Sequence, residues 1–100
     1  MPERINVRLT VVGSKRQVRL FQKSNWQRHL HARYVELLEN SPRRFACQFE
    51  TETLPLAPLN RVSRRSPRLT FLADYESEGN RIKGLAKAEG RKLDHCQLGY

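Results

Sequence analysis

The 100-residue sequence has little cysteine, no long apolar run and few acids, and each shortage excludes a class of protein. The two cysteines, Cys47 and Cys96, lack the Cys-x-x-Cys spacing of a zinc site. We expect both to be reduced, because disulfides are rare in proteins without an export signal. No apolar run approaches the ~20 residues of a membrane-spanning helix, and the N-terminus lacks the pattern of a secretory signal. The sequence therefore predicts a cytoplasmic protein that does not bind membranes.

Signatures of catalysis and cofactor binding are also missing. On a helix, His29 and His31 would point about 160° apart, so they could not share a metal ion. The segment Gly13-Ser14-Lys15 resembles part of a phosphate loop but lacks the full G-x-x-x-x-G-K pattern. No zinc-finger, RRM or KH signature occurs either. We therefore predict a non-enzymatic protein with no metal and no cofactor, and the alternative is a small nuclease that uses one of its histidines.

Positive charge is what the sequence has in excess, with a net charge of +9. Residues 1–33 contain eight Lys or Arg and one acid, whereas residues 34–60 are net acidic. Residues 61–100 contain nine basic residues and five acids. A surface of this sign concentrates polyanions, and solubility alone does not require so uneven a distribution. The sequence therefore predicts a polyanionic partner.

Hydrophobic periodicity predicts a single α+β domain over residues 1–100. Alternation of apolar and polar residues predicts five strands, the last with the weakest pattern, at residues 5–11, 45–51, 69–75, 82–88 and 92–98. Two prolines predict a loop over residues 53–60, and one short helical turn is expected over residues 61–66. Together with the helices described next, this order predicts an antiparallel sheet with helices packed on one face.

The remaining apolar residues have helical spacing. A capping box precedes a helix over residues 15–23, in which Val18 and Phe21 face inward. A second helix is predicted over residues 24–39, because four apolar residues share one helical face: Trp26, Leu30, Tyr34 and Leu37. We expect Trp26 in the core rather than in a binding site, because it belongs to this face.

Two stretches resemble the YubB-type ferredoxin-like family, small proteins of bacterial plasmids, phages and related mobile elements. In the first, the strand residues Leu9-Thr10-Val11-Val12-Gly13 precede Val18 and Phe21, as in the family's opening strand and helix. The second consists of Ser66-Pro67-Arg68-Leu69-Thr70-Phe71, then Tyr75-Glu76, Gly79, Ile82 and Gly84. The resemblance covers somewhat under half of the chain. It implies a ferredoxin-like fold and an accessory role on mobile DNA, and it supplies no catalytic residues.

Two basic clusters are the candidate binding residues. The first combines a strand residue with one side of the helix over residues 15–23, and its members are Arg8, Lys15, Arg16, Arg19 and Lys23. The second is an arginine-rich segment that contains Arg61, Arg64, Arg65 and Arg68. Such cations bind phosphates spaced along a backbone, and arginine pairs with phosphate through two hydrogen bonds. The alternatives are a solvated helix face for the first cluster and ion pairs with Glu50, Glu52 or Glu76 for the second.

These observations predict a small basic protein that contacts the phosphates of DNA or RNA without strong sequence specificity. Such binding weakens steeply with salt, because it releases the counterions condensed on the nucleic acid. The alternative is a regulatory protein of a mobile element that docks onto an acidic host protein through the same charges. The sequence also leaves a homodimer open, because an edge strand of the sheet can pair with a second copy.

Overall fold

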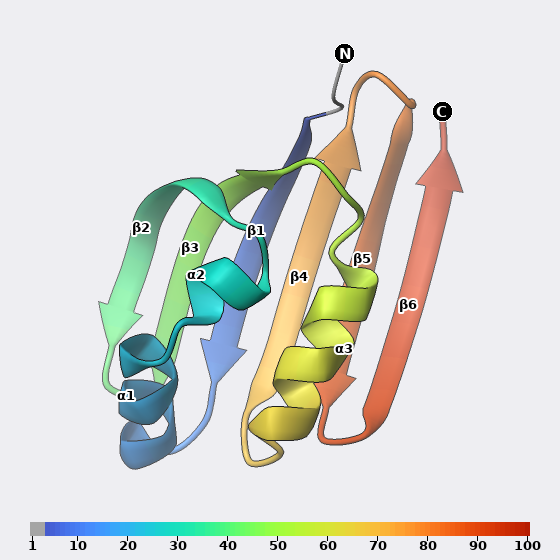
Figure 1. Cartoon of the computed structure of the whole chain (residues 1–100). Coiled ribbons are helices and arrows are strands. Elements are labelled where there is room, and N and C mark those ends of the chain that lie inside the picture. The colour runs from blue at the N-terminus through green and yellow to red at the C-terminus, as the bar shows by residue number, and fades with distance from the viewer. Residues whose placement is uncertain (1–3) are drawn as a thin grey trace.

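A computed structural model describes residues 4–100 of the chain (Figure 1). Within these residues, six strands form one antiparallel sheet in the order β2-β3-β1-β4-β5-β6. The elements along the chain are β1 (Ile5–Val12), α1 (Lys15–Lys23), α2 (Trp26–His29), β2 (Arg33–Ser41), β3 (Arg44–Thr51), α3 (Leu56–Arg65), β4 (Thr70–Ser77), β5 (Ile82–Glu89) and β6 (Lys92–Gly99). The edge strands of the sheet are therefore β2 and β6.

All three helices lie on one side of the sheet, and the other side is open (Figure 1). Side chains alternate between these two sides along each strand. In β1, every second residue from Ile5 to Val11 is buried beneath the helices. Pairing carries this alternation across the sheet, so that Val7 lies between Phe49 of β3 and Tyr75 of β4. The core therefore fills the space between the sheet and the helices.

Five aromatic side chains hold α1 and α2 on the sheet. Phe21 of α1 stacks on Trp26 of α2 with ring centroids 5.7 Å apart, and it meets Phe71 of β4 edge-on at 5.3 Å. Trp26 packs against Phe45 and Phe49 of β3 at 5.5 and 6.3 Å. Aromatic pairs in these geometries stabilise a core beyond the area that they bury. The prediction that Trp26 belongs to the core is confirmed.

The predicted helix over residues 24–39 is wrong beyond its first turn. The short helix α2 ends at His29, and His31 has a φ of 55°, a left-handed conformation that does not continue a helix. The chain then enters the edge strand β2, which pairs with β3 through a register with two irregularities. Tyr34 and Leu37, which the helical spacing placed in the core, are 79% and 55% exposed. Pairing with β3 is a tertiary contact, and it outweighs the local spacing.

The helix α3 occupies much of the segment that was predicted to be a loop. Pro58 lies in its first turn, where a helix makes no use of the N–H that proline lacks. Leu59 and Val62 are buried against the sheet. Ser63 also donates from Oγ to the carbonyl oxygen of Gly90, at 2.9 Å, which joins α3 to the turn between β5 and β6. The loop prediction therefore holds only before Leu56.

The other predicted elements are confirmed, including the helix over residues 15–23 and the weakly patterned last strand. The α+β class and the placement of the helices on one face are confirmed as well. The six-stranded order is broader than the predicted ferredoxin-like sheet, because β5 and β6 extend the sheet beyond β4. Among residues 4–100, no helix has the length and apolar character needed to cross a membrane.

Candidate nucleic-acid interface

Charge is segregated between the helices and the rest of the molecule. We define the helical layer as residues 13–32 and 55–68, which contain the three helices and the loops that adjoin them. This layer contains nine Lys or Arg and no acid, whereas the rest of the chain contains ten basic residues and ten acids. The entire net charge of +9 therefore belongs to the helical layer.

The cations of the helical layer form no ion pair within residues 4–100. In the part of the chain that the structure describes, the ion pairs are Arg33 with Glu52, at 2.9 Å, and Arg44 with Glu39, at 3.2 Å. Both pairs involve β2, β3 or the loop after β3, and neither includes a residue of the helical layer. The arginines of the second cluster therefore do not form the alternative ion pairs with Glu50, Glu52 or Glu76.

On α1, the predicted cations lie on the exposed side. Val18 and Phe21 are buried, and the four cations around them are exposed to solvent: Lys15, Arg16, Arg19 and Lys23. The helix begins with Ser14, whose Oγ accepts from the backbone N–H of Gln17 at 3.3 Å, as the predicted capping box requires. The local pattern therefore placed this cluster correctly.

Arg8 lies on the other side of the sheet from α1, so the expectation that it joins the first cluster is wrong. It lies between the buried residues Val7 and Leu9, and alternation turns it to the open side. There it is paired in register with Gln48 of β3 and Asp74 of β4. Proximity in sequence brought Arg8 close to α1, but the two-residue period of the strand decides which side it faces.

The second cluster borders a groove between α2 and α3. The groove has a volume of about 370 Å³, and its lining is Arg28, His29, His31, Arg61, Val62 and Arg65. It therefore combines three guanidinium groups and two imidazoles without a carboxylate. Arg64 and Arg68 are exposed but do not line it.

One contact between side chains crosses this groove. Nη1 of Arg65 lies 3.2 Å from Nε2 of His29. The same Nη1 lies 3.5 Å from Nδ1 of His29, so the guanidinium rests against the imidazole ring. Arg65 therefore contacts an imidazole in place of a carboxylate, and its charge remains available to an anion.

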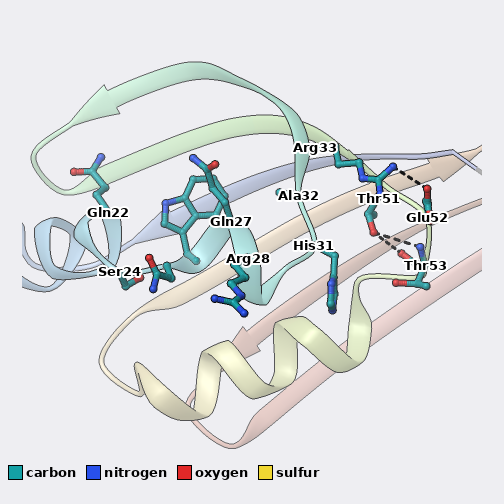
Figure 2. Close-up of a pocket in the computed structure, with 12 residues that line it drawn as sticks. Gln22, Ser24, Gln27, Arg28, His31, Ala32, Arg33, Thr51, Glu52 and Thr53 are labelled. Carbon is teal, nitrogen blue, oxygen red and sulfur yellow. Dashed lines mark hydrogen bonds and ion pairs between the residues drawn. The ribbon is translucent and has the colours of Figure 1, made fainter.

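A second hollow of about 800 Å³ adjoins the groove (Figure 2). Arg28 and His31 line both, and Figure 2 shows their side chains pointing toward α3. Uncharged polar side chains make up much of the rest of its lining: Gln22, Ser24, Asn25, Gln27, Thr51 and Thr53. The ion pair between Arg33 and Glu52 lies at one end.

Little in the sequence selects Arg28, His29 and His31 as binding residues. They belong to an acid-free stretch of the chain, and that was the available signal. These residues lie close to α3 because α2 ends at His29. The predicted helix continued to residue 39 and would not have brought them there. Within residues 4–100 no three His, Cys, Asp or Glu side chains are grouped in a way that would hold a metal ion.

The third histidine belongs to a hydrogen-bonded cluster on the sheet. The Tyr75 hydroxyl donates to Oε1 of Gln97 at 2.7 Å and lies 2.6 Å from Nε2 of His95. The hydroxyl has one proton, so in this arrangement His95 donates to it. Burial raises the pKa of Tyr75, and the nearby Cys96 contributes to the rise. The cluster joins β4 to β6 across β5, and it is not part of the groove.

The two cysteines are free and occupy different sides of the sheet. Cys47 of β3 is buried beneath the helices, and Cys96 of β6 is exposed on the open side. Three strands separate β3 from β6, so the two thiols are too far apart to form a disulfide with each other.

No protein-family model, curated protein or solved structure matches this chain. The composition and geometry of the helical layer therefore carry the information about its function.

Proposed function

We propose that the protein binds nucleic acid through the phosphate backbone, using the helical layer as its interface and performing no catalysis. The observation that carries the proposal is the concentration of the whole net charge of +9 in residues 13–32 and 55–68. A solvated helix face normally has both signs of charge, because an unbroken field of one sign repels itself. A polyanion removes that repulsion.

The open side of the sheet provides a comparison with the helical layer within the same molecule. Its cations alternate with acids across neighbouring strands, as when Lys87 of β5 lies opposite Asp94 of β6. Opposite charges in such pairs stabilise a sheet and leave little net field. The two sides of the molecule therefore differ in net electrostatic field, although both have many cations.

The test is a fluorescence titration of mixed-sequence DNA and RNA at about 50 and 200 mM salt. We expect affinity to fall steeply between the two salt concentrations. In Arg16→Gln/Arg19→Gln, the loss of two phosphate contacts should weaken binding about tenfold. The matched control is Lys83→Gln/Lys87→Gln, which removes the same charge from the open side and should bind like the wild type.

Two results would contradict the proposal. One is a wild type that binds neither DNA nor RNA at low salt. The other is an equal loss of affinity in the two variants, which would mean that net charge rather than the helical layer governs binding. If the wild type does not bind nucleic acid but binds polyglutamate, an acidic protein partner becomes the better interpretation.

We also propose that β1 to β4 with their helices form a ferredoxin-like unit to which the β5–β6 hairpin has been added. In its support, β3 lies between β1 and β2, and β1 lies between β3 and β4, so two strand–helix–strand units interlock. The resemblance to the YubB-type family is proposed on the same basis. The residues that carry it belong to β1, α1 and the segment that forms β4, β5 and their turn. An accessory role on mobile DNA would be consistent with phosphate binding.

A further inference from the structure

The groove and the adjoining hollow have complementary chemistry. The groove between α2 and α3 is cationic, whereas the hollow is lined largely by amides and hydroxyls. Arg28 and His31 line both, so the two spaces adjoin at these side chains. A charged site joined to a neutral polar site matches the two parts of a nucleotide, its phosphate and its nucleoside.

The groove has what a phosphate requires. Arg61 and Arg65 are four residues apart on α3, and therefore on one side of the helix, while Arg28 faces them from α2. Arg65 contacts His29 in place of a carboxylate. Guanidinium groups form two parallel hydrogen bonds with phosphate oxygens, and such charge-assisted bonds are stronger than neutral ones. A phosphate between these side chains would supply the counterion that residues 4–100 do not.

The hollow has what a nucleoside requires. Its volume of about 800 Å³ lies within the range of small-molecule sites, and Trp26 and Ala32 contribute apolar surface. Among the described residues, the side-chain amides of Asn25 and Gln27 have no hydrogen-bond partner, so their donors and acceptors are available. Thr51 Oγ1 is held by the backbone of Thr53, at 3.1 Å to its carbonyl oxygen and 3.3 Å to its N–H. Side-chain amides are suited to base edges because each offers both a donor and an acceptor.

The backbone at the junction is also unusual. His31 has a φ of 55°, which is uncommon for a residue other than glycine, and it directs the chain from α2 into β2. This turn places the imidazole where the groove meets the hollow. Uncommon backbone conformations occur preferentially at ligand sites.

We infer that these two spaces form a nucleotide subsite that takes one unpaired nucleotide of a single strand, with its phosphate in the groove and its base in the hollow. The inference rests on the proposed function and adds to it a preference for single strands over duplexes. In a duplex, the Watson–Crick edge of each base is occupied by its partner, so the amides of the hollow cannot reach it. Single strands therefore bind more tightly than duplexes of equal charge.

The experiment compares three probes with the same number of phosphates: a mixed-sequence single strand of about 24 nucleotides, a duplex of about 12 base pairs, and an abasic strand of about 24 positions that keeps the phosphates without the bases. The wild type should bind the single strand at least about tenfold more tightly than either other probe. In Asn25→Ala/Gln27→Ala this preference should disappear, because two base contacts of ordinary strength are lost. Affinity for the duplex and the abasic strand should remain at the wild-type value.

Two control variants separate this subsite from general charge and folding effects. Asn6→Ala/Gln48→Ala removes a matched pair of amides from β1 and β3 on the open side and should keep the single-strand preference. Arg61→Ser/Arg65→Ser should weaken the binding of all three probes, because every probe has phosphates. Unchanged thermal melting of each variant verifies that it is folded.

The outcomes also separate the inference from the proposed function. Equal affinity of the wild type for the three probes would overturn the nucleotide subsite and leave phosphate binding intact. A preference that survives in Asn25→Ala/Gln27→Ala would overturn it as well. Failure to bind any probe at low salt would overturn the proposed function itself.

Discussion

Replacing Gly84 by alanine should destabilise the protein by disturbing the Tyr75 cluster. Gly84 of β5 is paired with Tyr75 of β4, and the tyrosine ring lies over the place where a side chain would begin. A Cβ there would contact Cζ and Oη of Tyr75 and would lie 2.8 Å from its Cε1. Ordinary contacts begin near 3.4 Å, so the ring must move by at least about 0.6 Å.

That displacement acts on two hydrogen bonds as well as on packing. It moves the hydroxyl relative to His95 and Gln97, which lie 2.6 and 2.7 Å away. Overpacking costs roughly 1–3 kcal/mol, and each of the two weakened hydrogen bonds adds about 0.5–1 kcal/mol, so the total is roughly 2–5 kcal/mol. For a domain of this size the melting temperature should fall by at least about 8 °C.

Thermal denaturation followed by circular dichroism measures this effect. The control is Gly79→Ala in the turn between β4 and β5, where an added Cβ would meet nothing within 4 Å and stability should not change. In the Gly84→Ala background, Tyr75→Phe should cost less than it does in the wild type, because the hydroxyl has already lost its partners. A Gly84→Ala protein with the same melting temperature as the wild type would refute the reasoning.

Three further predictions concern residues outside the interface. Burial raises the pKa of the Cys47 thiol from 9.0 to about 12. The unfolded chain therefore loses this proton at a lower pH than the folded protein does. The free energy of unfolding should accordingly fall as pH rises from 9 toward 12. In urea titrations Cys47→Ala should show a shallower fall, and equal slopes would contradict the assignment. Among residues 4–100, Ser77 Oγ is buried without a hydrogen-bond partner, so Ser77→Ala should keep or raise stability by up to about 1 kcal/mol, and a clear loss would indicate a partner. Arg8→Gln should leave nucleic-acid affinity near the wild-type value, because Arg8 faces the open side; a loss as large as that of Arg16→Gln would place the interface elsewhere.

Elements with a strong local signal could be predicted from the sequence. The strand β1 has an uninterrupted two-residue alternation, and α1 has a capping residue and a buried side at helical spacing. Even the weakly patterned β6 was found, because its neighbour β5 supplies a hairpin partner. For β1 and α1, the information that determines the element lies within the element, and for β6 it lies in the adjacent hairpin strand.

The errors arose where distant contacts decide the structure. Residues 33–41 have helical spacing but become β2 through pairing with β3. Pro58 suggested a loop, yet its position in the first turn is compatible with α3. The groove joins residues 28–31 to residues 61–65, and no local pattern relates two segments so far apart. Composition could indicate a polyanionic partner, but it could not show which residues lie together in the groove.

Binding of nucleic acid to the helical layer is tested most directly by amide chemical-shift mapping with NMR. A mixed-sequence single strand is titrated into labelled protein at low salt, and the shift change of each amide is recorded. We predict that the largest changes occur in residues 13–32 and 55–68 and that β5 and β6 change little. Changes concentrated on β5 and β6, or no changes at all, would contradict the claim.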